Sequence, residues 1–195
     1  MASSARMILA AAVTLAPAAQ ANPARAAMLQ AFAAHCFSPF LTAGTARANI
    51  LPSGARLDFH DARPFSDAAP SSTDGRAATP GTDRRCEVAF DGDHGADAAE
   101  VARRGLAAEK ITTEAPLPVS HAGTDGTTLL GARFLNPGRI AVVETGTRPG
   151  PNGVETFLSV ERLTPAASRE ASRDGYIVCS STMEPGRTCS TVNAA

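Results

Sequence analysis

The chain has 195 residues, a formal net charge of −1 at pH 7 and four cysteines. This length suits one domain with a single hydrophobic core. The near-neutral charge argues against a nucleic-acid-binding surface, which needs clustered basic residues. The chain has no tryptophan and one tyrosine, so few rings are available to stack on bases or sugars.

The first 21 residues have the layout of a cleavable export signal. Arg6 gives a positive start, residues 7–15 form a short apolar run, and Ala19 and Ala21 occupy the two positions that a signal peptidase reads. The run is too short to span a bilayer, and no cysteine follows Ala21 directly. We therefore expect a periplasmic or secreted protein of residues 22–195, with neither a membrane span nor a lipid anchor.

The first half of this mature chain contains two predicted helices and two predicted strands. A capping asparagine, Asn22, precedes a proline and predicts a helix that ends near Cys36. Residues 56–61 alternate apolar and polar side chains, as in a half-buried strand. Residues 64–83 lack periodicity and are interpreted as a flexible loop. A second strand over residues 85–90 and a second helix over about residues 96–108 follow.

The second half has the clearest β pattern. Three strands are expected over residues 127–135, 139–145 and 154–163, and their short links indicate an antiparallel meander. A short helix over residues 165–174 and a hairpin over residues 176–192 complete the chain. The predicted fold is α+β: a single domain with one mainly antiparallel twisted sheet of about seven strands and two or three helices packed on one face.

The four cysteines predict two disulfides, because an exported chain with an even number of cysteines usually pairs them. Cys179 and Cys189 lie equally far from the centre of the final hairpin, so we expect them to face each other. Cys36 and Cys86 then form the other pair. The spacings are not those of zinc ligands, since no C-x-x-C pair occurs. We expect no metal and no other cofactor.

The densest polar cluster is formed by Asp91, Asp93, His94 and Asp97. Carboxylates in such a group could bind a divalent cation. The same residues suit the start of the second helix, where acidic side chains meet the positive end of the helix dipole. The cluster is therefore interpreted as structural, with Asp91, Asp93 and Asp97 as the candidate ligands if a metal binds.

His60 is the best candidate for a general base, because Asp58 shares its face of the predicted strand. His94 is a second candidate. The simpler interpretation is a solvated surface residue for His60 and a structural role at the helix start for His94. The chain contains neither a G-x-S-x-G nor an H-E-x-x-H motif. The arginine pairs at residues 84–85 and 103–104 could bind anions and are expected to be solvated.

Two short segments, HCFSP at residues 35–39 and RCEVAFD at residues 85–91, resemble exported proteins of unknown function from alphaproteobacteria. The resemblance covers the first half of the mature chain. It implies bacterial export and brings no activity, cofactor or site residue.

The leading hypothesis is a soluble, non-catalytic binding or accessory protein of the periplasm or the medium. Its partner would be a small molecule or a periplasmic protein, contacted through the predicted polar loops of residues 64–83 or 112–126. One alternative is a small exported hydrolase that uses His60 or His94 with a neighbouring aspartate. Another is an inhibitor-like module that presents residues 148–153 as a loop. The sequence specifies neither the ligand nor the oligomeric state.

Overall fold

The computed structural model describes residues 22–65, 67–72, 75–136, 138–173, 176–179 and 189–192. For Asn136 and the last two segments it describes the backbone only. The predicted export signal, residues 1–21, lies outside the described residues. Among the helices that are described, none is long and apolar enough to cross a membrane.

Two capped helices open the domain. The side chain of Asn22 accepts a hydrogen bond from the backbone N–H of Ala24 at 3.0 Å, and helix α1 (Pro23–His35) follows as the sequence predicts. Helix α2 (Ala43–Ile50) was not predicted. Its start is fixed by a reciprocal capping box in which Thr42 and Thr45 each bond the backbone N–H of the other.

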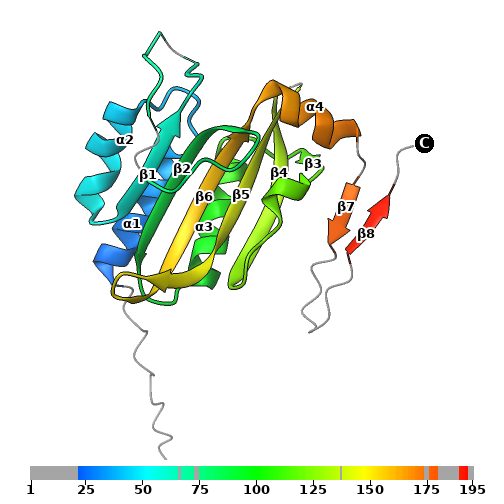
Figure 1. Cartoon of the computed structure of the whole chain (residues 1–195). Helices are drawn as coiled ribbons and strands as arrows, with labels where there is room; N and C mark the ends of the chain where they lie inside the picture. Colours follow the sequence, from blue (N-terminus) through cyan, green and yellow to red (C-terminus); the bar gives the residue numbers. More distant parts are fainter. Residues whose placement is uncertain are drawn as a thin grey trace, which may run out of the picture.

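The central feature is a six-stranded antiparallel sheet with the strand order β1-β2-β6-β5-β4-β3 (Figure 1). The chain therefore returns from the β4–β5–β6 meander to pair β6 with β2. The strands are β1 (Arg56–Asp61), β2 (Thr82–Asp91), β3 (Glu114–Ala115), β4 (Thr127–Asn136), β5 (Arg139–Gly150) and β6 (Gly153–Leu163).

The predicted α+β class is confirmed, but the expected sheet of about seven strands is wrong in its count. The final hairpin, β7 (Tyr176–Cys179) with β8 (Cys189–Val192), forms a separate two-stranded sheet. The helix between β6 and β7 interrupts the meander, so the hairpin pairs with itself. The main sheet gains instead the two-residue strand β3, which lies in the predicted loop of residues 112–126.

Three helices cover one face of the sheet. Helices α1, α2 and α3 (Gly95–Ala108) pack with apolar side chains of β1, β2, β5 and β6 that point to that side. In the view of Figure 1, α1 and α3 lie behind the sheet. The main core forms here because alternate strand residues, such as Val88 and Val143, direct apolar side chains to the helices.

Helix α4 (Pro165–Arg173) departs from the expectation that the helices share one face. Its Ala171 packs in a second, smaller core with Ile140 and Leu163. Ile140 points away from α1–α3, whereas Val143 of the same strand points toward them. The small alanine side chains allow α4 to cover the far end of the other face closely, and charged side chains such as Arg85 and Glu161 lie on the rest of that face.

The disulfide Cys36–Cys86 is confirmed. It joins the residue that caps the end of α1 to the helix-facing side of β2, with a Cα–Cα distance of 5.4 Å. In the final hairpin the backbone register pairs Cys179 with Cys189. Their side chains lie outside the described atoms, so the second disulfide stays a prediction.

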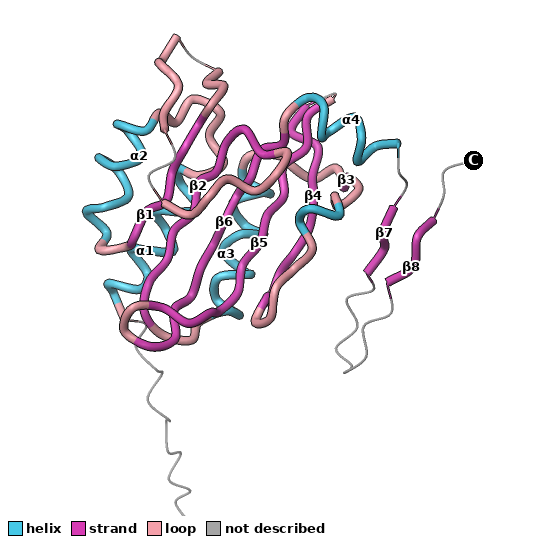
Figure 2. Tube along the Cα trace, viewed as in Figure 1, coloured by secondary structure: helices cyan, strands magenta, loops and turns pink. Residues whose placement is uncertain are grey.

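Two loops differ from their predicted form. Residues 148–153, expected as an exposed loop, mostly belong to strands: β5 extends to Gly150 and β6 starts at Gly153, which leaves two residues in the turn. Residues 75–81 cross the sheet on the side away from α1 and α3 (Figure 2), whereas Phe65, nearer to β1, lies on the helix-covered side with Cys36 and Val160. The flexibility of the loop stays a prediction, but Arg76 and Thr79 in this loop contact strand residues.

Candidate functional site

The candidates Asp58, His60 and Arg85 lie on the face of the sheet opposite α1–α3, which we call the polar face. Strand register aligns Asp58, Glu87, Ser159 and Glu144 in one row across β1, β2, β6 and β5. The neighbouring row carries His60, Arg85, Glu161 and Val142. Residues two apart on a strand share a face, so the predicted pair of Asp58 and His60 does lie on one side of β1.

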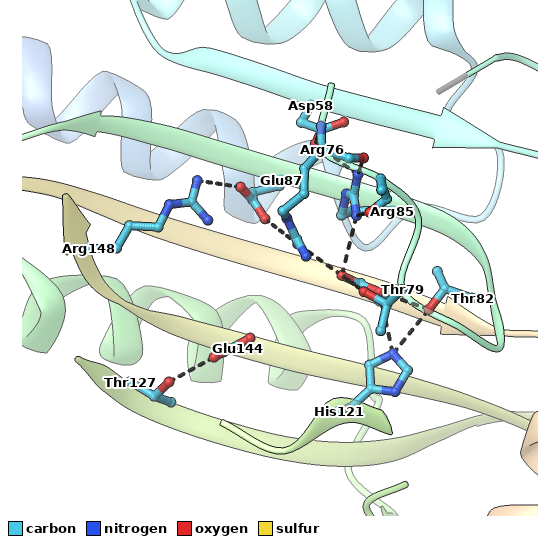
Figure 3. Close-up of polar contacts among 12 residues, drawn as sticks. Asp58, Arg76, Thr79, Thr82, Arg85, Glu87, His121, Thr127, Glu144 and Arg148 are labelled. Atoms are coloured by element: carbon cyan, nitrogen blue, oxygen red, sulfur yellow. Dashed lines mark hydrogen bonds and ion pairs between the residues drawn. The ribbon is translucent and has the colours of Figure 1, made fainter. Parts of the chain in front are cut away.

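Arg85 stands at the centre of this face and is fully buried. Its Nη2 donates to Asp58 at 2.9 Å and to the backbone carbonyl of Arg76, while Nη1 donates to the carbonyl of Ala77 at 3.0 Å. Figure 3 shows the loop over residues 76–82 lying across the strands at this point. Arg85 therefore attaches the loop to the sheet.

Two further arginines reach Glu87 from opposite sides (Figure 3). Arg76 donates to one carboxylate oxygen at 2.9 Å and Arg148 to the other at 2.6 Å. Arg148 also binds Glu155 at 2.6 Å, and its guanidinium lies 4.7 Å from the centre of the Phe157 ring. Both oxygens of Glu87 are thus occupied within the protein.

Glu161 is the most strongly perturbed carboxylate of the polar face. Burial alone would raise its pKa, but hydrogen bonds from His121, Thr79 and Thr82 lower the pKa to about 2. Thr79 donates to one carboxylate oxygen at 3.0 Å, and Thr82 donates to the other at 2.8 Å. Arg76 adds a contact at 3.1 Å. Glu161 is therefore an ionised structural anchor and a poor proton donor or acceptor at neutral pH.

His60 is buried, and burial followed by repulsion from Arg85 lowers its pKa. Neither ring nitrogen has a hydrogen-bond partner among the described residues. Asp58 is engaged by Arg85. Ser159 is a hydroxyl residue in the row next to that of His60. It lies on β6, however, two strands away from His60 on β1. At about 4.8 Å between neighbouring strands, the two backbones are about 10 Å apart. Among the described residues, neither ring nitrogen of His60 is hydrogen-bonded to a hydroxyl or thiol.

The second predicted cluster is dispersed. His94 precedes α3 on the helix-covered side, where Nη1 of Arg25 lies 3.1 Å from its Nδ1. Asp91 instead bonds Arg56 at 2.8 Å, and Asp97 lies 3.7 Å from Arg25. Within the part of the chain that the structure describes, no group of three or more histidine, cysteine, aspartate or glutamate side chains could hold a metal ion. The structure also keeps His94 and His60 on opposite faces.

A different feature offers space for a ligand. A pocket of about 390 Å³ opens on the helix-covered side, where α1 and α3 end. Its apolar lining comes from Cys36, Phe37, Pro39, Phe40, Phe65, Ile111, Leu135 and Val160. Two arginines, Arg84 and Arg162, line it as well, and Glu109 contributes from the end of α3. We call this the arginine pocket. Its volume lies in the range of sites that hold small molecules.

The arginines of the pocket belong to a chain of five alternating charges. Arg84 lies 3.5 Å from Asp61, which accepts from Arg162 at 2.8 Å. Arg162 also donates to Asp83 at 2.9 Å, and Asp83 accepts from Arg139 at 3.1 Å. Arg84, Asp61, Arg162 and Asp83 are all buried. Three guanidinium groups thus face two carboxylates, which leaves one positive charge without a counter-charge in the chain.

Burial shifts the pKa of Arg84. Desolvation and the neighbouring Arg162 lower the pKa, the attraction of Asp61 and Asp83 opposes them, and the pKa falls to about 10. Arg84 still donates to the carbonyls of Pro39 and Leu41, each at 3.0 Å, in the segment between α1 and α2. It therefore fixes one wall of the pocket as well as its charge.

The arginine pair at residues 84–85 was expected to be solvated, and this is wrong. Both side chains are buried, and they point to opposite faces of β2 because consecutive strand residues alternate. The sequence held a signal for this: the pair lies at the start of a predicted strand, and the aspartates of residues 56–61 could pair with it. Arg103 and Arg104 on α3 are exposed, as predicted.

Comparison with protein-family models, with curated proteins and with solved structures found no significant match to this chain.

Proposed function

We propose that this chain is an exported, soluble and non-catalytic binding protein, and that the arginine pocket holds its ligand, a small molecule with a largely apolar body. The observation that carries the proposal is the open space of about 390 Å³ between eight apolar side chains and two buried arginines. Sites of this kind, apolar with a few fixed polar groups, are typical of small-molecule binding.

The polar face supports a binding role over a catalytic one. Its carboxylates and guanidinium groups pair with one another, and Glu87 has both oxygens occupied. A general base needs a reacting proton within hydrogen-bond distance, and His60 contacts no hydroxyl or thiol among the described residues. The predicted use of residues 64–83 as a contact loop is supported by Phe65, which lines the arginine pocket.

The proposal is tested with Nile red, a neutral dye that fluoresces in apolar surroundings. We expect saturable binding to the intact protein with one site. Ile111→Trp, which fills the pocket with a larger side chain, should weaken binding at least tenfold. Val119→Trp is the matched control, because Val119 is 79% exposed and does not line the pocket. Absence of saturable binding, or equal binding by both variants, would contradict the proposal.

Export is supported by the apolar run before residue 22 and by the confirmed Cys36–Cys86 bridge, since disulfides persist in oxidising compartments. N-terminal sequencing of protein recovered from the periplasm or medium should begin at Asn22. If the protein recovered from the periplasm or medium retained Met1, the proposed cleavage of an export signal would be contradicted.

A further inference from the structure

We propose that the ligand of the arginine pocket is an amphipathic monocarboxylate, whose carboxylate pairs with Arg162 and whose apolar chain lies against the aromatic lining. This inference rests on the proposed function, because it names the ligand class of the same pocket. It depends on the charge of the pocket, on one hydrogen-bond donor without a partner, and on the distribution of apolar side chains.

The first support is the charge imbalance beneath the pocket. Arg84, Arg162 and Arg139 carry three positive charges, and Asp61 and Asp83 carry two negative ones. A buried charge is costly unless an opposite charge lies beside it. One bound anion would complete the alternating chain, and it would also oppose the burial that lowers the pKa of Arg84.

The second support is the Nη1 group of Arg162. The Nε and Nη2 groups of this side chain donate to Asp83, to Asp61 and to the carbonyl of Arg63. Nη1 is buried and has no hydrogen-bond partner among the described residues. Buried donors in native proteins are almost always paired. Because Arg162 lines the pocket and is 3% exposed, a ligand carboxylate is the partner that this donor lacks.

The third support is the apolar surface at the pocket, which a simple inorganic anion would leave uncovered. Phe40 is 70% exposed and Phe65 47% exposed, and both line the pocket with Ile111 and Leu135. Covering such side chains with an alkyl or aryl chain is favourable. Glu109, exposed directly after α3, disfavours a second carboxylate near the pocket, so the ligand carries one charge.

Phe65 determines access to Arg162. The guanidinium carbon of Arg162 lies 4.7 Å from the centre of the Phe65 ring, so the ring covers one face of the group. Because this ring is half exposed, turning it aside loses little packing. The bound chain then replaces the ring beside Arg162, and Phe65 packs against the chain.

Isothermal titration of the intact protein with four eight-carbon compounds tests the inference. Octanoate should bind at least tenfold more tightly than octan-1-ol, because a hydrogen bond to a charged group is worth about that factor. Octylammonium and the dicarboxylate suberate should also bind at least tenfold more weakly than octanoate. Equal binding of octanoate and octan-1-ol, both blocked by Ile111→Trp, would overturn the monocarboxylate while leaving the proposed function intact. If none of the compounds binds and Nile red does not bind, both proposals fail.

A substitution separates the carboxylate contact from general charge. Arg162→Met should remove the preference for octanoate over octan-1-ol, whereas Arg103→Met, at a site 58% exposed on α3, should leave it unchanged. If Arg162→Met retains the preference, the assignment to Arg162 is wrong. Arg162 also holds Asp61 and Asp83, so this variant could fail to fold. The comparison of ligands on the unmodified protein then decides the question.

Discussion

Glu161 on the polar face gives the sharpest prediction about stability. Glu161→Gln keeps the shape of the side chain but removes the negative charge. That charge strengthens the hydrogen bonds that Thr79, Thr82 and Arg76 donate to the carboxylate. The pKa of Glu161 falls from 4.5 to about 2 on folding. One pKa unit corresponds to about 1.4 kcal/mol, so the ionised carboxylate contributes about 3 kcal/mol of stability at pH 7.

The sign of the pH dependence follows from the lowered pKa. The contribution of Glu161 is complete above pH 4.5, the value for the unfolded chain, and is lost as the pH falls toward the folded value of about 2. The difference in unfolding free energy between the native protein and Glu161→Gln should therefore shrink from about 3 kcal/mol at pH 7 to about 1.4 kcal/mol at pH 3.

Urea denaturation followed by far-ultraviolet circular dichroism measures this, since the chain has no tryptophan to report by fluorescence. Glu100→Gln is the control, because Glu100 is 59% exposed on α3. It should change the free energy of unfolding by less than about 0.5 kcal/mol. The reasoning is refuted if Glu161→Gln costs no more than Glu100→Gln, or if its cost is the same at both pH values.

Two further substitutions test the helix-covered side. The double change Cys36→Ala and Cys86→Ala should lower the free energy of unfolding by about 4 kcal/mol, because the bridge closes a separation of 50 residues; equal urea midpoints for this variant and the oxidised protein would contradict it. Gly105→Ala should destabilise α3, because a Cβ there would overlap the ring of Phe37, whereas Gly44→Ala on α2 meets no atom within 4 Å and should stabilise by about 0.5–1 kcal/mol. Thermal melting of the two glycine variants, which should shift in opposite directions, checks this.

Local sequence patterns were sufficient for much of the sheet. Alternation at residues 56–61 and the turn residues between residues 127 and 163 predicted β1, β4, β5 and β6, and the cap at Asn22 predicted α1. Helix α2 was missed because its sequence, AGTARANI, has few large apolar residues to show helical periodicity. The final hairpin was predicted, but its separation from the main sheet was not. The pairing of strands in a sheet depends on contacts between distant segments rather than on local pattern.

The arginine pocket also could not be predicted from local sequence patterns. The five charges of its arginine–aspartate chain come from four separate strands, and Asp61 and Arg162 are 101 positions apart. The sequence suggested pairs of near neighbours, such as Asp58 with His60. In the structure Asp58 instead accepts a hydrogen bond from Arg85. Arginines are seldom buried, so residues 84–85 were interpreted as surface. Only the register of β1, β2 and β6 shows which carboxylates neutralise the charges of these buried arginines.

The position of a bound ligand tests the central claim most directly. In protein labelled with ¹³C in its methyl groups, we predict nuclear Overhauser contacts between octanoate and the methyl groups of Ile111, Leu135 and Val160, which line the arginine pocket. The methyl groups of Val119 and Val154, both exposed outside the pocket, should show none. Contacts confined to those exposed valines, or a spectrum that octanoate leaves unchanged, would contradict the account.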